Sequence, residues 1–436
     1  MNATIFALAS APGRAGVGVV RLSGPLAGRA AESLAGPLPP PRQAVLRRLA
    51  HDGAEIDHAL LLWFPAPGSF TGEDVAEFHI HGGRAVREAL FGALSELGAR
   101  EAEPGEFSRR AVENGKLDLT RAEAVADLVD AETPAQLRQA LRQHDGALAD
   151  LYEGWRARLI AALGRAEAAI DFSDDGVGES EFAAARRAAG EIAGEIQEHV
   201  DDAGRGESLR EGLRLTILGP PNAGKSSLIN ALARRDVAIV SETPGTTRDV
   251  IEVRLNLGGY LLHVADTAGV RQTRDAIEAE GVRRALSHAA GGLTLLLLDG
   301  SLPDPRAGLP PDLPEPDLTV WNKADLFDRE GGFAREGLSI SLKTGEGLSM
   351  LQSMLQQKVQ QKLDGDGAPL LTRPRHRQAL GEALGALRHG LEAPADRPEL
   401  LAEDLRLAMR AVGRITGRVD VEELLDFVFR DFCIGK

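Results

Sequence analysis

The sequence contains one cysteine, Cys433, among 436 residues. A single thiol excludes an internal disulfide, and no pair of cysteines is present for a zinc ribbon. The N-terminal run MNATIFALAS lacks the basic segment that opens a signal peptide. No stretch approaches the roughly 18 uninterrupted apolar residues of a membrane helix. We therefore expect a cytoplasmic protein.

Basic residues are in deficit, with 50 Lys and Arg against 65 Asp and Glu, for a net charge of −15. This balance argues against binding of nucleic acid through a broad basic surface, because phosphate neutralisation needs clustered cations. A local basic patch, or recognition of a single looped or flipped nucleotide, stays open. The length predicts roughly two to four domains.

Four regions differ in pattern. Residues 1–116 contain short apolar runs (VGVVRL, ALLLWF, AEFHIH) that predict strands of an α+β domain. Residues 117–208 and 366–436 have helical periodicity, and residues 209–365 alternate strand-like and helical runs that predict a mostly parallel α/β sheet. The pattern predicts a multidomain protein in which an α/β domain is inserted into one helical bundle.

The first helical region contains two predicted helix starts. Thr120 and Glu123 have the spacing of a capping box, and Thr133 followed by Pro134 predicts a second start. From Leu137 to Leu163, apolar residues recur three, four or seven apart, which predicts one apolar stripe on a long helix in the bundle core.

The stretch LRLTILGPPNAGKSSLINAL places G-x-x-x-x-G-K-S between an apolar strand and a helix. This context predicts a phosphate-binding loop, in which backbone N–H groups surround the phosphates. Lys225 is expected to reach the outer phosphates and the Ser226 hydroxyl to bind magnesium.

Guanine specificity is predicted by WNKAD, which follows a strand well downstream of the loop. Asp325 can accept hydrogen bonds from the ring N–H and the amine of guanine, whereas adenine offers no matching pair of donors. Asn322 and Lys323 are expected to hold the base and the loop in place. The run SLKTGEG suits a base-supporting loop.

Two further runs complete a GTPase pattern. VADTAG supplies Asp266 near magnesium and Gly269 near the γ-phosphate, and Thr247 of PGTTRD is a candidate to close on magnesium. Val270 stands where Ras-like enzymes have a water-orienting glutamine. Either hydrolysis is slow, or a downstream carboxylate (Glu278 or Glu280) positions water while the Asn222 amide holds a monovalent cation.

The chain resembles the MnmE family of tRNA-modification GTPases, also called TrmE. The resemblance rests on APGRAGVGVVRLSG, SFTGEDVAEFHIHGG, PGEFSRRAVENGKLDLTRAEAVADLVDAET, PNAGKSSLIN, GTTRD and the terminal FCIGK. It implies a cytoplasmic homodimer joined by folate-binding N-terminal domains. With an FAD-dependent partner subunit (MnmG/GidA type, in a heterotetramer), such proteins use 5-formyl- or 5,10-methylene-tetrahydrofolate to add an aminomethyl-type (carboxymethylaminomethyl) group to C5 of the wobble uridine of certain tRNAs.

The resemblance also implies roles for matching residues. Hydrolysis would be activated by potassium-dependent dimerisation of the GTPase domains, with potassium held by Asn222, Ser241, Thr243 and Thr246. Ser226 and Thr247 would hold magnesium, and Glu278 would orient water. The folate site would contain Arg21, Glu77, Lys116 and Lys436, with Cys433 near the one-carbon group or the uridine. Ser241 stands where the family often has threonine, and Leu342 where it has alanine.

The candidate GTP-binding residues are Asn222, Ala223, Gly224, Lys225, Ser226, Ser227, Ser241, Glu242, Thr243, Pro244, Gly245, Thr246, Thr247, Asp266, Thr267, Ala268, Gly269, Asn322, Lys323, Ala324, Asp325, Ser341, Leu342 and Lys343.

For several features, the sequence leaves two interpretations open. Cys433 is either part of a dispensable tail or of a site, while Ile-Gly-Lys after it does not fit prenylation. His79 and His81, on one face of a predicted strand, could coordinate a metal ion together with a third ligand, but no third ligand is evident in the sequence. Arg109 and Arg110 are either a solvated pair or part of a tRNA-facing patch. For the whole protein, the alternative to a modification enzyme is a regulatory or assembly GTPase; the pairing of NGKLDL with the C-terminal cysteine favours the enzyme.

Overall fold

The computed structural model describes residues 3–172, 177–234, 252–265, 291–307, 309–310, 313–326, 337–365, 370–419, 422–430 and 432–435. They form two compact units, each assembled from separate segments of the chain. Unit 1 contains Met1–Val129, Gln143–Ala189 and His389–Lys436, and unit 2 contains Asp130–Arg142 and Gly190–Arg388. Each unit is described by itself. Within the described residues, no helix combines the length and the apolar character needed to cross a bilayer.

Unit 1 opens with a six-stranded sheet in the order β3-β4-β5-β2-β1-β6. All neighbours are antiparallel except β1 and β6, which are parallel. The strands are β1 (Ile5–Leu8), β2 (Ala15–Ser23), β3 (Val45–His51), β4 (Ala54–Phe64), β5 (Val75–Gly82) and β6 (Arg100–Glu101). The three strand runs expected between residues 1 and 116 are β2, β4 and β5.

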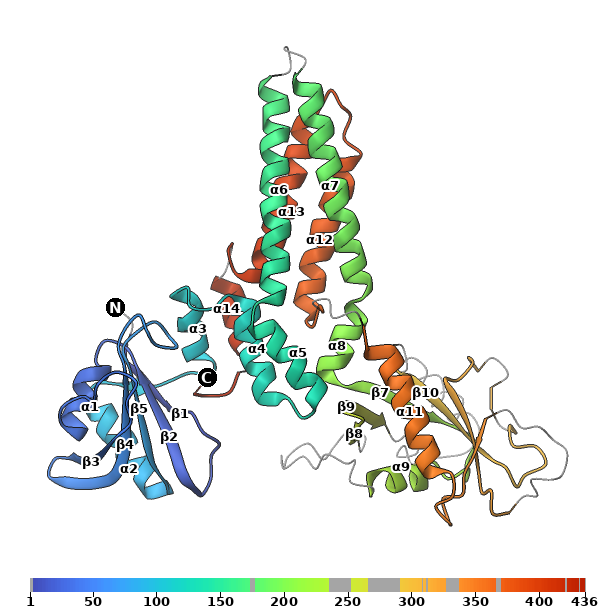
Figure 1. Ribbon diagram of the computed structural model, residues 1–436, viewed down its shortest axis with the longest axis horizontal. Coiled ribbons are helices and arrows are strands. Elements are labelled where there is room, and N and C mark those ends of the chain that lie inside the picture. Colours follow the sequence, from blue (N-terminus) through green and yellow to red (C-terminus); the bar gives the residue numbers. More distant parts are fainter. Residues whose placement is uncertain are drawn as a thin grey trace. The chain divides into compact units, whose positions relative to one another are not determined.

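The two faces of this sheet bury different clusters. Helices α1 (Ala27–Ala35) and α2 (Arg84–Glu96) pack over a core that contains Phe6 (Figure 1). Ile5 and Ala7 instead lie in a separate cluster with Phe107 of α3 (Glu106–Glu113). Alternate residues of a strand point to opposite faces, so β1 joins both clusters and places α3 on the face away from α1 and α2.

Further helices of unit 1 come from both ends of the chain. They are α4 (Leu119–Asp130), α6 (Ala147–Asp171), α13 (Pro398–Thr416) and α14 (Glu422–Phe429), and α6 packs along α13 (Figure 1). Leu119 of α4 shares a buried cluster with Phe429 and Phe432 near the C-terminus. Leu119, the last residue of NGKLDL, is thus packed against the segment that precedes Cys433.

The expected capping box at Thr120 is wrong. Helix α4 begins at Leu119, and Asp118 caps it by accepting hydrogen bonds from the backbone N–H groups of Thr120 (2.9 Å) and Arg121 (3.1 Å). A carboxylate two residues earlier satisfies the free N–H groups, so Thr120 becomes helical. The second start is confirmed, because α5 (Pro134–His144) begins at Pro134 and Thr133 Oγ1 accepts from the Gln136 N–H at 3.4 Å.

The single long helix expected from Leu137 to Leu163 is also wrong. Helix α5 ends at His144, and α6 begins only after Gly146, which has a φ of 106°. That left-handed conformation suits glycine and breaks the helical phase. Leu137 and Leu141 are consequently 45% and 44% exposed, while the core positions of the predicted stripe lie in α6, at Leu148, Trp155 and Leu159.

Unit 2 contains a second six-stranded sheet, in the order β12-β11-β10-β7-β9-β8. It is parallel except for the β8–β9 pair. The strands are β7 (Leu213–Leu218), β8 (Glu252–Leu257), β9 (Tyr260–Ala265), β10 (Leu293–Asp299), β11 (Leu318–Asn322) and β12 (Leu338–Ser339). The predicted α/β class is confirmed.

Helices α8 (Ala203–Glu211), α9 (Lys225–Ala233) and α11 (Leu348–Leu363) belong to unit 2, whereas α7 (Val177–Asp201) and α12 (Pro374–Leu391) pass from one unit into the other. Leu215 and Ile217 of β7 belong to the core that contains α9 and α11, whereas Leu218 belongs to a second cluster. Both faces of the sheet are therefore covered, which explains the nearly continuous apolar sequence of β7 and β10. The boundaries of the four predicted regions stay predictions.

Candidate functional site

The phosphate-loop motif joins β7 to α9, as its spacing predicts. Gly219, Asn222 and Gly224 have φ values of 151°, 61° and 102°. A Cβ on Gly219 would lie 2.2 Å from the carbonyl oxygen of Leu297, and one on Gly224 would lie 2.5 Å from Nδ2 of Asn322. The motif needs glycine at both positions because the neighbouring strands leave no room for a side chain.

The N-terminus of α9 offers the chemistry expected for phosphates. Lys225 Nζ donates to the carbonyl oxygens of Gly219 (2.7 Å) and Pro220 (2.9 Å), so its ammonium group lies over the loop. No side chain caps α9, and Ser226 and Ser227 are exposed. The first N–H groups of a helix lack partners within the helix and favour a bound anion.

Asn322, only 3% exposed, ties the two halves of the predicted nucleotide site together. Its Nδ2 donates to the Ala223 carbonyl at 2.8 Å, and its Oδ1 accepts from the Leu342 N–H at 3.3 Å. One amide thus holds the phosphate loop and the SLK loop against the end of β11. The carboxyl ends of parallel strands are where α/β sheets bind ligands.

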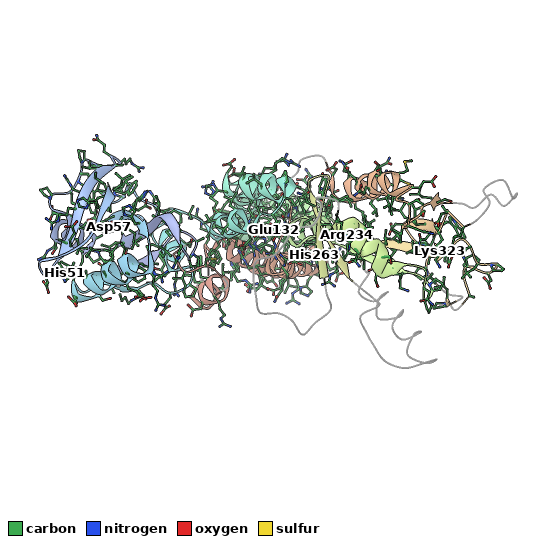
Figure 2. All side chains as sticks on the ribbon, turned by 90° about the horizontal axis from the view of Figure 1, so that it is seen from below. His51, Asp57, Glu132, Arg234, His263 and Lys323 are labelled. Carbon is green, nitrogen blue, oxygen red and sulfur yellow. The ribbon has the colours of Figure 1, made fainter. Side chains whose placement is uncertain are left out.

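Lys323, labelled in Figure 2, pairs with Asp299 at the end of β10. Burial opposes ionisation of Asp299, but hydrogen bonds from Lys323 and Ser301 hold the pKa of its carboxyl below the ordinary value. The pair is therefore ionic at neutral pH and fixes the direction in which the chain leaves β11.

Asp325 is positioned as an acceptor. The buried Ser341 hydroxyl donates to its Oδ1 at 2.7 Å, and this hydrogen bond lowers the pKa of the Asp325 carboxyl. Asp325 itself is exposed. It therefore presents an ionised carboxylate with capacity for the two donors on the edge of a guanine.

The N-terminal candidate site is built around Arg21. Its Nε donates to Glu77 Oε1 at 3.0 Å, and both side chains are mostly buried. Its guanidinium carbon lies 5.4 Å from the ring centroid of Phe70 and 5.7 Å from that of Phe107. A guanidinium beside two aromatic rings and one carboxylate has a fixed orientation, which suits recognition of a planar polar ligand.

Lys116 contacts the loop between β4 and β5, which also contains Phe70. Its Nζ donates to the Pro67 carbonyl at 3.0 Å, and a Cβ on Gly72 would lie 3.2 Å from Lys116 Cγ. Phe70 belongs to the same loop, so three of the four predicted folate residues converge on residues 67–77.

The C-terminal tail is docked against the start of α3. The Gly105 N–H donates to the Cys433 carbonyl at 3.3 Å, and a Cβ on Gly435 would lie 2.3 Å from the Leu8 carbonyl oxygen. The Cys433 side chain is exposed while its backbone is held. Phe107, against which Arg21 lies, is two residues after Gly105, so one short helix start links the cysteine to the Arg21 cluster.

Several expected residues lie outside the described residues. They are Ser241 to Thr247, Asp266 to Val270, Glu278, Glu280 and Lys436. Their predicted roles stay predictions.

Arg110 fits neither interpretation offered for the Arg109–Arg110 pair. It is 3% exposed and pairs with Glu73 (3.0 Å) and Glu106 (2.9 Å), so it is a buried structural cation. Arg109 pairs with Glu113 and with a carboxylate of α14.

The two histidines of β5 do not share a ligand set in the described part of the chain. His81 Nδ1 lies 2.7 Å from Asp57, while His79 Nε2 lies 3.7 Å from Glu77.

Sequence reasoning missed Phe70 and Phe107, which flank Arg21, and Asp299, which holds Lys323. An aromatic residue in the Gly-rich run SFTGED was the available signal for Phe70. No sequence signal identified Phe107 or Asp299, because their partners are distant along the chain.

Comparison with known proteins covers nearly the whole sequence. A family model described as the MnmE helical domain matches residues 119–433, and one described as the N-terminus of the GTP-binding protein TrmE matches residues 4–116. The first alone spans more than half of the chain.

Curated relatives match along their full length. A protein of Rhodospirillum rubrum is 56% identical, with 99% of both chains covered. Proteins of Paramagnetospirillum magneticum and Maricaulis maris are 54% and 50% identical, with 100% of both chains covered. All three carry the name tRNA modification GTPase MnmE.

Among solved structures, the G domain of Thermotoga maritima FeoB is 20% identical over 35% of this chain and 99% of that one, with a TM-score of 0.24. Likeness at this level does not establish a shared fold. The family models and the full-length relatives decide the matter: the chain belongs to the MnmE family.

Proposed function

We propose that this protein hydrolyses GTP and takes part in modification of tRNA. In the finer form of the proposal, a tetrahydrofolate one-carbon unit serves to build an aminomethyl-type group on C5 of the wobble uridine, together with an FAD-dependent partner subunit. The observation that carries it is the docking of the Cys433 backbone beside the Arg21 cluster, in a chain that also has a guanine-type nucleotide site.

GTP hydrolysis is supported by the phosphate loop and the SLK loop of unit 2, which Asn322 joins. Asn322 couples the phosphate loop to the base loop, and Asp325 is held ionised by Ser341. Magnesium, when bound, would neutralise charge on the outer phosphates. The exposed Ser226 hydroxyl at the start of α9 fits that role, with Thr247 as the second proposed ligand.

The mechanism of hydrolysis is proposed to depend on potassium and on pairing of two GTPase domains. Asn222 is exposed, and no hydrogen bond engages its side chain within the described residues, so its amide oxygen fits an alkali cation beside the phosphate loop. Ser241, Thr243 and Thr246 are the further proposed ligands, and Glu278 is proposed to orient the attacking water in place of the missing glutamine.

Folate binding is supported by the Arg21 cluster of unit 1, which consists of Arg21, Glu77, Phe70 and Phe107. Arg21 pairs with Glu77, and Lys116 contacts the neighbouring loop at Pro67. Phe70 and Phe107 are the aromatic walls beside Arg21. Arg21 and Glu77 would bind polar edges of a pterin-like ring, and the terminal Lys436 is the remaining proposed contact. The exposed Cys433 thiol would lie near the reacting carbon or the uridine.

A homodimer joined through the N-terminal domains and a cytoplasmic location complete the proposal. The alternative, a regulatory GTPase without modification chemistry, gives no role to the NGKLDL segment together with the exposed Cys433 thiol of the C-terminal tail.

Complementation of a bacterial strain that lacks its own MnmE tests the proposal. The wild-type chain should restore the wobble-uridine modification, measured by mass spectrometry of tRNA nucleosides. Lys225→Ala should fail to restore it although the protein accumulates, because the loop loses the cation for the outer phosphates. Absence of the modification with the wild-type chain, expressed with its partner subunit and hydrolysing GTP, would instead favour the regulatory alternative.

A further inference from the structure

A pocket of about 140 Å³ lies within unit 2, away from the phosphate and base loops. Its walls come from α5, α8, the first residue of β9 and the end of α11, together with the described residues Asp364, Gly365 and Leu370. Three lining side chains are arginines (Arg138, Arg142 and Arg205), and one, Asp364, is a carboxylate. The lining therefore has excess positive charge in a chain whose net charge is −15.

Two of these arginines, Arg138 and Arg142, form no hydrogen bond or ion pair with any residue that the structure describes, and both are exposed. They lie four residues apart on α5, so their like charges are neighbours on one helix face and repel each other. Other exposed arginines, such as Arg84 and Arg406, pair with nearby glutamates. Two neighbouring arginines in a concave site, without an ion pair to a described residue, are typical of an anion-binding site.

The helix that carries them is held firmly. The Ala135 N–H donates to the Gly259 carbonyl of the β8–β9 turn at 3.1 Å, and Gln136 Nε2 donates to the Arg210 carbonyl of α8 at 2.8 Å. Glu132, labelled in Figure 2, pairs with Arg254 of β8 at 2.9 Å. Binding groups on an anchored helix lose little conformational freedom when a ligand enters.

The opposite wall is already arranged around Asp364. The Tyr260 hydroxyl donates to the Asp364 carboxylate, and burial together with this carboxylate raises the pKa of Tyr260 to about 12. Arg205 pairs with Asp202 and donates to the Asp364 carbonyl at 3.3 Å, while its buried Nε has no hydrogen-bond partner among the described residues. The Asp364 carboxylate thus already accepts a hydrogen bond, whereas Arg138 and Arg142 make neither a hydrogen bond nor an ion pair with a described side chain.

We infer that this site, the arginine pocket, binds a phosphate group. Guanidinium groups match phosphate oxygens with paired hydrogen bonds. A water molecule takes roughly 30 Å³ of liquid volume, so the pocket has room for one phosphate group and some water. If the proposed function holds, the expected source is a backbone phosphate of the bound tRNA; a free phosphate has the same chemistry.

The test uses the full-length protein with its nucleotide site filled by a non-hydrolysable GTP analogue and magnesium, so that all three phosphate positions are occupied and added phosphate cannot bind there. Arg138→Ala with Arg142→Ala removes the unpaired charges. Arg186→Ala with Arg187→Ala is the matched control, because it removes two exposed arginines of α7 that do not line the pocket and have no described partner. Inorganic phosphate is titrated by calorimetry, and tRNA affinity is measured over a range of salt concentrations.

The pocket variant should bind tRNA about tenfold more weakly at low salt, and its plot of log affinity against log salt should be shallower by about 1 for each lost phosphate contact. The control should match the wild type. Loss of inorganic phosphate binding alone would support the pocket with a free phosphate as its source. Equal behaviour of pocket variant and control in both titrations would overturn the inference. A wild type that binds phosphate but no tRNA would contradict the proposed function and leave the pocket standing.

Discussion

Asn322 illustrates, at the scale of one residue, what the N-K-x-D pattern does and does not reveal. The pattern predicts its place beside the base, and the structure adds that its amide joins Ala223 to Leu342. Those partners are distant in sequence and follow only from the parallel register of β7, β10 and β11. Local rules likewise identified Thr133 as a cap but chose Thr120 over Asp118, because two neighbouring oxygens competed for the same N–H groups.

Replacing Asp325 by asparagine should weaken GTP binding by at least about 100-fold. In the variant, one hydrogen bond keeps an acceptor but loses its charge, and the other loses its acceptor altogether; hydrogen bonds to a charged group are each worth roughly 1.5–3 kcal/mol. Xanthosine triphosphate, whose ring offers an acceptor where guanine has its amine, should bind better than GTP. Fluorescent-nucleotide titration measures both affinities, and unchanged GTP affinity would remove Asp325 from the base site.

Asn222→Gly tests the proposed alkali-ion ligand without straining the loop, since glycine readily adopts the φ of 61° found there. We expect the variant to keep its GTP affinity and to lose the excess of hydrolysis in potassium over sodium. Steady-state phosphate release in the two salts is the measurement. A variant with the wild-type ratio would show that the amide does not hold the ion.

At the scale of elements, sequence periodicity located most helices and strands but not every boundary. The leucine spacing from 137 to 163 is compatible with one helix, yet Gly146 divides it. A Cβ there would lie 2.2 Å from Arg121 Nη2, so the break is fixed by a packing contact that periodicity does not contain. The parallel strands of unit 2 were easier to predict, because strands buried on both faces of a sheet are mostly apolar.

The cap of α4 is open to direct test. Asp118→Ala should cost about 1–2 kcal/mol of helix stability, since two N–H groups lose their acceptor. Amide hydrogen exchange in the first turns of α4 should accelerate roughly 5- to 30-fold. Thr120→Val is the comparison, because it removes a hydroxyl that donates to Asp118 Oδ1 at 2.6 Å but leaves the capping carboxylate in place, and its effect should be smaller. Equal acceleration in both variants would restore Thr120 as the cap.

The attachment of α3 to the sheet should depend on pH through Glu106. Burial opposes its ionisation, but hydrogen bonds from Arg100, the Glu103 N–H and Arg110 hold the pKa of the Glu106 carboxyl below its ordinary value. A depressed folded-state pKa stabilises the fold above the unfolded value of about 4.3, and this contribution disappears as pH falls through the folded value.

Glu106→Gln should therefore destabilise the attachment of α3 to β6, which contains Arg100, by about 2–3 kcal/mol at pH 7, and by progressively less as pH falls below about 4. Hydrogen exchange at pH 7, followed by urea unfolding at lower pH, measures the difference. Glu113→Gln, on the same helix but in a more exposed ion pair, should cost less than about 1 kcal/mol. A Glu106 effect that stays constant with pH would contradict the ionic origin.

At the scale of the whole molecule, the order of motifs predicts an α/β domain inserted into a helical one, and this division into domains stays a prediction. The structure has two units, each assembled from separate chain segments, and both contain parts of the predicted helical regions. The sequence also indicated that the tail is docked, because an apolar run precedes Cys433. It did not reveal that Gly105 and Leu8 receive the tail, since those contacts join residues more than 300 positions apart.

The most direct measurement is the wobble-uridine content of tRNA from cells that express Cys433→Ser, combined with the GTP hydrolysis rate of the purified variant. The thiol is exposed and its backbone is held by Gly105, so serine should preserve the fold. We predict loss of the modified nucleoside with normal GTP hydrolysis. Undiminished modification in these cells would contradict the proposal that the docked tail brings a reacting group to the Arg21 cluster.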